Sequence, residues 1–223
     1  MSIPKIIHYC WFGKGEKTHL MERCIGSWKK YCPDWQIIEW NEENFDVDFC
    51  PYAAKAYKEK RYGFLADAAR LKIIYENGGV YLDTDVELKH SLDELLENEA
   101  WFGYGQETEI NTGSGFGAVR GHWIVKLMLE QYLDFSKDQP YEVCTKVDTR
   151  VFRDHFPDYA GDHTVRQEYQ GILILNNIWH YVVHHYTGTW MTKRQRAITY
   201  LAGLLPEGIR TELVRLRRKM AKR

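Results

Sequence analysis

Residues 64–88 read FLADAARLKIIYENGGVYLDTDVEL, and this one continuous segment combines a helix pattern, two glycines, a strand pattern and two carboxylates. Apolar or small residues recur through its first half at the spacing of one helix face, which predicts a helix. Gly78 and Gly79 follow and supply a left-handed cap that ends this helix. The next residues, 80–82, are β-branched, aromatic and apolar, which is typical of a buried strand. A helix that leads into a buried strand predicts an α/β fold.

Asp83 and Asp85 close the predicted strand. Side chains two apart on a strand point the same way, so the two carboxylates can approach one cation, or one metal-bound phosphate, together. A plainer explanation is a turn, because aspartate is favoured in turns at strand ends. The triplet alone is weak evidence for a site, since residues 46–48 carry a second Asp-x-Asp that follows no convincing strand. The order of helix, double glycine and strand is much rarer than the triplet, and it marks residues 83–85 as the candidate site.

Two further segments carry polar residues that are candidates for function. Asp67 and Arg70 lie three residues apart, which places them on one face of the predicted helix, where a surface ion pair is the simplest explanation. Residues 107–117 form a polar, glycine-containing loop that is a candidate for contact with an acceptor, since glycine permits close approach of a ligand to the backbone. An ordinary surface loop is the alternative there.

Residues 66–70 (ADAAR) and 78–85 (GGVYLDTD), in this order, resemble the signature of glycosyltransferase family 32, whose members carry a DXD motif in a sugar-binding region. The resemblance implies a GT-A fold, a Rossmann-like α/β domain that binds a nucleotide sugar. It also implies transfer of a sugar with retention of anomeric configuration, with Mn²⁺ or Mg²⁺ on the donor diphosphate. The resemblance spans residues 3–190, with its most specific motifs in the central segment.

The same resemblance implies a role for each polar residue of the central segment. Asp83 and Asp85 are expected to hold the metal. Asp67 is expected on sugar or ribose hydroxyls, and Arg70 on the donor sugar or phosphate, where a guanidinium stabilises the departing diphosphate. These four residues form the predicted catalytic set, and Tyr81 is expected beside them in the donor site.

The opening of the chain, residues 3–13, reads IPKIIHYCWFG and predicts a strand followed by a glycine loop. Ligands of α/β folds bind at the carboxyl ends of strands, which is where this loop lies. The family resemblance extends to the opening and implies that Trp11 stacks on the nucleotide base. A core tryptophan at a strand end is the alternative.

Residues 181–190 read YVVHHYTGTW and match, more loosely, a histidine followed by a small hydroxyl residue and tryptophan near the end of family members. Neutral imidazole is a good ligand for manganese beside carboxylates. Adjacent strand side chains point to opposite faces, so one histidine of the pair is expected to bind metal, and we take His185 over His184. Thr189 and Trp190 are expected to contact the phosphate or the glycosidic oxygen.

The length of 223 residues suits one sizeable domain, and we expect a GT-A domain over residues 1–190 with a basic helical extension over residues 191–223. A net charge of −1 argues against nucleic acid as a partner. Five cysteines, an odd number without a Cys-x-x-Cys pair, argue against a disulfide framework and against a structural zinc site. These features favour a reducing compartment.

The chain begins with a short strand pattern rather than a signal peptide, and it contains no apolar run of the roughly 20 residues that span a bilayer. We therefore expect a cytoplasmic protein. Residues 209–223 place apolar residues on one helical stripe among many Lys and Arg side chains, which favours peripheral contact with an anionic membrane surface on the inner face. A final helix that packs on the domain is the alternative.

Together these expectations describe a metal-dependent retaining hexosyltransferase that acts in surface polysaccharide synthesis. The donor is expected to be a UDP-sugar rather than GDP-mannose, and the acceptor a saccharide or a lipid-linked sugar. Two alternatives stay open. A phosphatase of the haloacid dehalogenase type also places Asp-x-Asp after a strand, but it needs Thr or Val where this chain has Glu87. A noncatalytic sugar-binding protein would keep the aromatic pockets and lack metal-dependent turnover.

Overall fold

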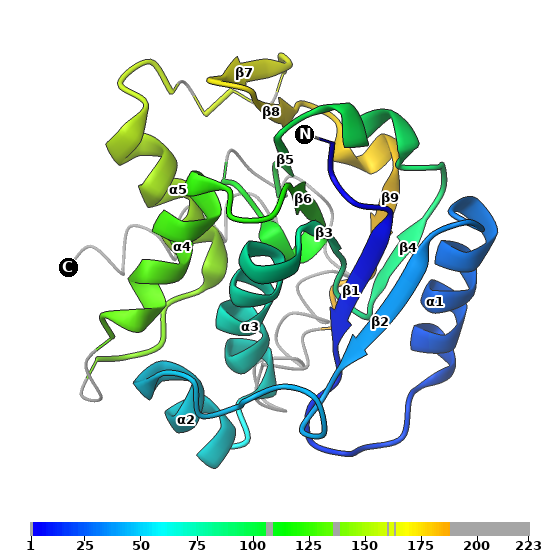
Figure 1. Cartoon of the computed structure of the whole chain (residues 1–223), viewed down its shortest axis with the longest axis vertical. Helices are drawn as coiled ribbons and strands as arrows, with labels where there is room; N and C mark the ends of the chain where they lie inside the picture. The colour runs from blue at the N-terminus through cyan, green and yellow to red at the C-terminus, as the bar shows by residue number, and fades with distance from the viewer. Residues whose placement is uncertain (1, 106–108, 136–138, 160, 163, 188–223) are drawn as a thin grey trace, which may run out of the picture. The chain divides into compact units, whose positions relative to one another are not determined.

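The computed structural model describes residues 2–105, 109–135, 139–159, 161–162 and 164–187 (Figure 1). The strands are β1 (Ile6–Cys10), β2 (Gln36–Trp40), β3 (Gly79–Tyr81), β4 (Val86–Leu88), β5 (Ala100–Gly103), β6 (Phe116–Ala118), β7 (Gln167–Tyr169), β8 (Ile172–Leu175) and β9 (Val182–His184). The α-helices are α1 (His19–Tyr31), α2 (Pro51–Lys58), α3 (Tyr62–Asn77), α4 (Trp123–Leu133) and α5 (Cys144–His155). Short 3-10 turns are η1 (Asp93–Glu97), η2 (Thr112–Ser114) and η3 (Ile178–His180).

The chain divides into two compact units, residues 1–186 and residues 187–223. The predicted basic extension at residues 191–223 lies outside the described residues, so its helical structure stays a prediction. Within the part of the chain that the structure describes, no helix combines the length and the apolar composition that crossing a bilayer requires.

One mixed sheet of seven strands, in the order β2-β1-β3-β6-β5-β8-β7, forms the centre of the first unit. β1 pairs in parallel with both β2 and β3, whereas β6 is antiparallel to β3 and to β5. β4 leaves this sheet and pairs with β9 in a separate antiparallel ribbon, where Val86 lies opposite His184. The segment between β3 and β4 therefore joins the main sheet to the ribbon, and it contains Asp83 and Asp85.

Helices cover both faces of the sheet, and each face has its own apolar core. α3 and α4 lie on one side, with α1 on the other (Figure 1). Tyr81 of β3 belongs to the core that includes α3 and α4, whereas the next residue, Leu82, belongs to the core that includes Trp28 of α1 and Val86 of β4. This alternation is what a strand buried on both faces produces. The predicted α/β class is confirmed.

The central segment folds as its sequence predicts. α3 ends at Asn77, Gly78 takes a φ of 69°, and β3 follows at once. A side chain at Gly79 would also lie 2.8 Å from the Ile6 carbonyl oxygen, so glycine is required there by close packing as well as by its φ of 102°. The double glycine therefore lets α3 turn directly into a strand beside β1.

His8 of β1 is fully buried and ties the end of α3 to the sheet. Its Nδ1 accepts a hydrogen bond from Trp40 Nε1 at 3.0 Å, and its Nε2 donates to the carbonyl oxygen of Gly78 at 3.0 Å. Both ring nitrogens are thus satisfied in the neutral imidazole, with the proton on Nε2. Burial lowers the pKa of His8 to about 4.

The buried imidazole makes stability fall in mild acid. The pKa of His8 is lower in the folded chain than the value of 6.5 in the unfolded chain, so its contribution is complete above pH 6.5 and is lost as the pH falls toward 4. We expect a loss of about 3 kcal/mol across this window. Urea unfolding at pH 7, 5.5 and 4.5 measures it, and His8→Gln should show a shallower decline. The same decline in both proteins would contradict the assignment.

Candidate active site

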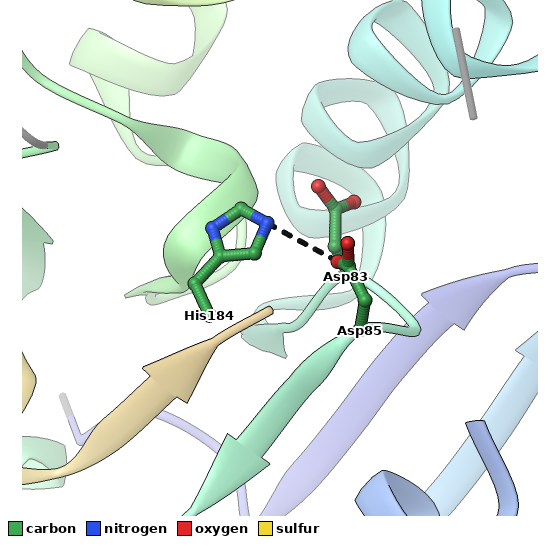
Figure 2. Close-up of side chains that lie close together, drawn as sticks. All are labelled: Asp83, Asp85 and His184. Carbon is green, nitrogen blue, oxygen red and sulfur yellow. Dashed lines mark ion pairs between the residues drawn. The ribbon is translucent and has the colours of Figure 1, made fainter. Parts of the chain in front are cut away.

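Asp83, Asp85 and His184 form a cluster where β3, β4 and β9 meet, with the imidazole and the two carboxylates close together (Figure 2). One ligand atom from each residue lies within 4.8 Å of the others, and His184 Nε2 lies 3.1 Å from Asp85 Oδ1. The register of the ribbon produces this meeting, because Val86 pairs with His184 and the His185 amide donates to the Asp85 carbonyl oxygen at 2.9 Å.

The donor set of this cluster fits a divalent cation. Carboxylate oxygens suit Mg²⁺ and Mn²⁺, and a neutral imidazole adds a nitrogen ligand. The Nδ1 atom of His184 lies 3.0 Å from Ser114 Oγ, so the hydroxyl can accept the Nδ1 proton and leave the Nε2 lone pair toward the aspartates. Ser114 is fully buried, which fixes this contact.

His185, which the sequence analysis took as the metal ligand, faces away from the carboxylate pair. Its Nε2 lies 2.9 Å from Glu87 Oε2, and Arg23 Nη2 lies 3.2 Å from the same oxygen. Neighbouring side chains of an extended segment point in opposite directions, so only one histidine can face the aspartates. The structure brings His184 to them, and the choice of His185 does not fit this arrangement.

Arg70 is the centre of a second cluster that shares Asp83 with the first. Its Nη2 lies 2.6 Å from Asp67 Oδ1 and 3.3 Å from Asp83 Oδ1. Tyr81 packs its ring over the guanidinium, with 5.0 Å between Cζ and the ring centroid, and donates its hydroxyl to Asp83 Oδ1 at 3.1 Å. The Arg70 side chain is 3% exposed, so the simple surface ion pair is wrong for Asp67 and Arg70.

Burial dominates the electrostatics of these carboxyl groups. It raises the pKa of Asp67 to about 7 and also raises the pKa of Asp83, and the positive charge of Arg70 opposes the rise in both. The neighbouring Asp85 adds to the rise at Asp83. Crowded, desolvated carboxylates gain from any further positive charge, which makes the site a favourable place for a cation.

Of the other residues predicted to contact the donor, the structure describes Trp11 but not Thr189 and Trp190. Trp11 lies directly after β1, is partly buried, and donates its Nε1 proton to the carbonyl oxygen of Gly15 at 2.8 Å. Its proposed stacking on a base stays a prediction. Thr189 and Trp190 lie outside the described residues.

The η2 turn lies inside the loop predicted at residues 107–117, and its contacts with the site were not predicted from the sequence. A Cβ atom on Gly113 would lie 2.6 Å from Asp83 Oδ2 and 2.9 Å from Arg70 Nη1, so glycine is needed for this close approach. Asn111 caps the turn by accepting hydrogen bonds from the amides of Gly113 and Ser114. The Asn-Thr-Gly-Ser sequence at residues 111–114 is typical of a turn, but nothing in it indicates which residues the turn contacts.

One protein family and several known proteins are similar to parts of this chain. Residues 18–102 match the family described as glycosyltransferase sugar-binding region containing DXD motif. The chain is 32% identical over 129 residues to inositol phosphoceramide mannosyltransferase 3 of Schizosaccharomyces pombe, which covers 54% of this chain and 35% of that protein. It is 34% identical over 111 residues to inositol phosphoceramide mannosyltransferase 2 of the same organism, with 44% and 30% covered. The chain therefore spans about a third of the length of these relatives.

A solved structure supports the fold. The structure titled PaToxG glycosyltransferase matches with a TM-score of 0.53 and 15% sequence identity, and the match covers 70% of each chain. At this identity the likeness shows a shared fold, and it agrees with the mixed sheet and flanking helices of a GT-A domain. Through residues 18–102, the chain is therefore similar to the family of proteins with a DXD-containing glycosyltransferase sugar-binding region.

Proposed function

We propose that this chain is a metal-dependent glycosyltransferase that transfers a hexose from a nucleotide sugar. The observation that carries the proposal is the Asp83, Asp85 and His184 cluster, which lies beside the buried Arg70 and contains the two aspartates of the DXD motif in the matched region. Aspartate and histidine ligands next to a fixed guanidinium suit a donor diphosphate, which needs both a cation and hydrogen-bond donors.

Each residue of the two clusters has a proposed task. Asp83, Asp85 and His184 would hold Mn²⁺ or Mg²⁺, and the imidazole favours Mn²⁺. The bound ion would supply Lewis-acid stabilisation of the leaving nucleotide diphosphate. Arg70 directs positive charge toward the same phosphates, and Asp67 fixes the guanidinium and offers oxygens to sugar or ribose hydroxyls.

The identity of the donor is the point on which the sequence and the relatives differ. The family resemblance of the sequence favours a UDP-sugar, whereas the named relatives are mannosyltransferases, which favours GDP-mannose. Their names also include inositol phosphoceramide, which is a lipid, in keeping with the lipid-linked acceptor proposed here. Transfer with retention and a role in surface polysaccharide synthesis are carried forward as parts of the proposal.

Nucleotide release from a panel of UDP- and GDP-sugars tests the function. The full chain is incubated with each donor and Mn²⁺, with EDTA in a parallel reaction, and a saccharide or lipid extract is added as acceptor. We expect metal-dependent release from one donor. Where release is absent, calorimetric titration with the same donors decides the matter, because a chain that binds no nucleotide sugar in the presence of Mn²⁺ contradicts the proposal.

The haloacid dehalogenase alternative is disfavoured by the surroundings of the first aspartate. In such a phosphatase that residue attacks phosphorus, but Asp83 accepts a hydrogen bond from Tyr81 and lies 3.3 Å from Arg70 Nη2, which lowers its nucleophilicity. Donor binding without turnover on any acceptor would instead support the noncatalytic sugar-binding alternative.

Residues 191–223 are proposed to be a basic extension of the catalytic domain that holds a cytoplasmic protein on the inner face of an anionic membrane. The support is the sequence pattern of residues 209–223. Sedimentation with phosphatidylglycerol vesicles, compared with phosphatidylcholine vesicles, tests it at low and high salt.

The two histidines should differ in their effect on metal binding. We expect His184→Ala to weaken Mn²⁺ binding by roughly 10-fold to 100-fold, whereas His185→Ala should weaken it less than about threefold, because only His184 faces the aspartates. Titration of each full-length variant with Mn²⁺, followed by electron paramagnetic resonance, measures the difference. The opposite order would restore the prediction made from the sequence.

A further inference from the structure

The η2 turn contacts both clusters of the candidate site. Thr112 Oγ1 lies 3.5 Å from Arg70 Nη1, Gly113 lies against Asp83, and Ser114 Oγ lies 3.0 Å from His184 Nδ1. The position of this one turn therefore sets the direction of the guanidinium and of the imidazole at the same time.

Helix α5 holds the turn from the side away from the cluster. Asp148 is fully buried, and its Oδ2 accepts hydrogen bonds from the Thr112 hydroxyl at 2.8 Å and from the Thr112 amide at 3.3 Å. The neighbouring Thr149 accepts from the Ile110 amide at 2.9 Å. Two adjacent side chains of α5, Asp148 and Thr149, therefore hold residues 110–112 by hydrogen bonds.

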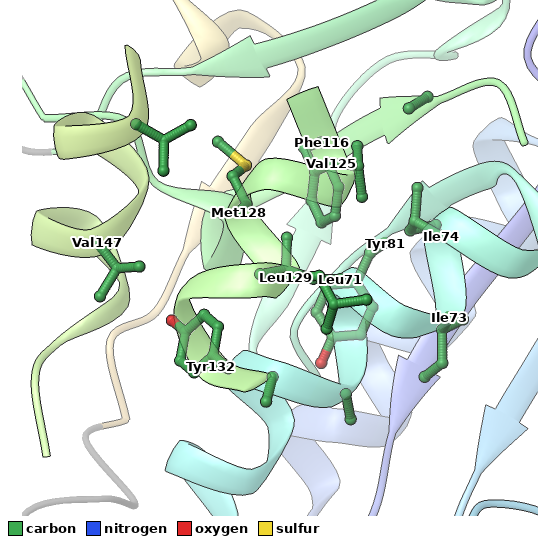
Figure 3. Packing of buried hydrophobic residues seen from close by; sticks show 14 of the residues in the cluster. Leu71, Ile73, Ile74, Tyr81, Phe116, Val125, Met128, Leu129, Tyr132 and Val147 are labelled. Carbon is green, nitrogen blue, oxygen red and sulfur yellow. The ribbon is translucent and has the colours of Figure 1, made fainter. Parts of the chain in front are cut away.

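The helix that carries Asp148 is itself firmly placed. Val147 and Val151 of α5 belong to the same apolar core as Met128 and Tyr132 of α4, and Figure 3 shows Val147 beside these α4 side chains. A side chain fixed on a packed helix is a better support for a site than one on a mobile loop.

A chain of two hydrogen bonds leads from Arg70 through Thr112 to Asp148, and each group donates to the next. Arg70 Nη1 points its proton at the Thr112 hydroxyl oxygen, and that hydroxyl gives its own proton to the carboxylate. Asp148 Oδ1 has no hydrogen-bond partner among the described residues. Burial raises the pKa of Asp148 to about 7, whereas the hydrogen bond from Thr112 and the positive charge of Arg70 oppose this rise, so the contact with Thr112 favours the charged carboxylate.

We propose that Asp148 is a positioning residue of this site, which acts through Thr112 to hold the η2 turn where Ser114 orients His184 and Thr112 orients Arg70. The inference rests on the proposed function for its meaning in catalysis. The contact itself, between α5 and the turn, can be tested without activity.

The test compares Asp148→Ala with Thr149→Val in the full chain. Asp148→Ala removes two hydrogen bonds from α5 to this segment and Thr149→Val removes one, but only the first variant releases Thr112. We expect amide hydrogen exchange of Gly113 and Ser114 to become at least about 10-fold faster in Asp148→Ala, and Mn²⁺ binding to become roughly 10-fold weaker. Thr149→Val should change either quantity less than about threefold. Asp148→Asn, which keeps an acceptor, should recover most of the exchange protection.

A second variant removes the same bond from its other end. Thr112→Val removes the hydroxyl bond at 2.8 Å and keeps the longer amide bond at 3.3 Å. It should reproduce most of the faster exchange at Ser114, and adding Asp148→Ala to it should change exchange much less than Asp148→Ala does alone, because the two residues act as one unit. Additive effects, or wild-type exchange in Thr112→Val, would overturn the proposal even if Asp148→Ala fails to fold. A wild-type chain that neither binds Mn²⁺ nor releases nucleotide would refute the proposed function, while the exchange comparison would still decide the role of Asp148.

Discussion

Metal-dependent nucleotide release is expected to fall about a thousandfold in Asp85→Ala, since a metal ion supplies several kcal/mol of transition-state stabilisation and each 1.36 kcal/mol is tenfold in rate. The physical reason is local. Asp85 brings one of the two carboxylates of the DXD motif to within 3.1 Å of His184 Nε2, so alanine removes one proposed ligand and the carboxylate nearest to this nitrogen. Initial rates of nucleotide release, measured on the donor that the panel selects, give the comparison.

The matched control for this variant lies in the other Asp-x-Asp triplet. Asp48→Ala changes the second acid of residues 46–48, which is exposed in a loop, and it should keep the full rate. EDTA added to the wild-type chain should reproduce the loss seen in Asp85→Ala. Equal rates in the wild type and in folded Asp85→Ala would remove the metal from the proposed mechanism.

Arg70→Met is expected to destabilise the fold by roughly 3–5 kcal/mol, because breaking a buried ion pair leaves uncompensated carboxylates in the interior. Arg70 lies between Asp67 and Asp83, and its side chain is 3% exposed. A loss of this size is a large share of the roughly 5–15 kcal/mol that holds a domain folded. Urea unfolding at pH 7.5 measures it, with circular dichroism as the signal.

A double variant separates the charge from the packing. In Asp67→Asn/Arg70→Met the closest carboxylate is neutral, so part of the stability should return, with a coupling of about 0.5–3 kcal/mol between the two positions. If the two changes instead add independently, the ion pair at 2.6 Å is not what makes Arg70 important for the fold.

The parts of the fold that the sequence predicted depend on signals close together in the chain. The helix α3, the cap at Gly78 and the strand β3 follow one another without a gap, and each has a local cause in helix spacing, glycine or β-branched residues. The strands β4, β6, β7 and β9 contain three residues each, which is too short for a pattern of alternation to be visible.

The candidate site, too, could be predicted where the signal is local in the sequence and not where it depends on contacts between distant segments. The pairing of Asp67 with Arg70 follows from a spacing of three on a helix, although its burial does not. The choice between His184 and His185 depends on the register of β9 against β4, which no local pattern contains. Asp148 lies inside an amphipathic helix, and only the packing of α5 against the core reveals that its carboxylate faces Thr112.

The β4–β9 ribbon links the site to the order of folding. Its two strands bring together residues about a hundred positions apart in the chain, so the third proposed ligand arrives only after a long loop has closed, a slow and entropically costly event. A nascent chain that has folded its sheet but not this ribbon would carry both aspartates and no histidine. A cation at a free concentration of a hundred times its dissociation constant would then favour the closed ribbon by about 2.7 kcal/mol. The ion would therefore stabilise the part of the fold that forms last, in addition to its role in binding the donor.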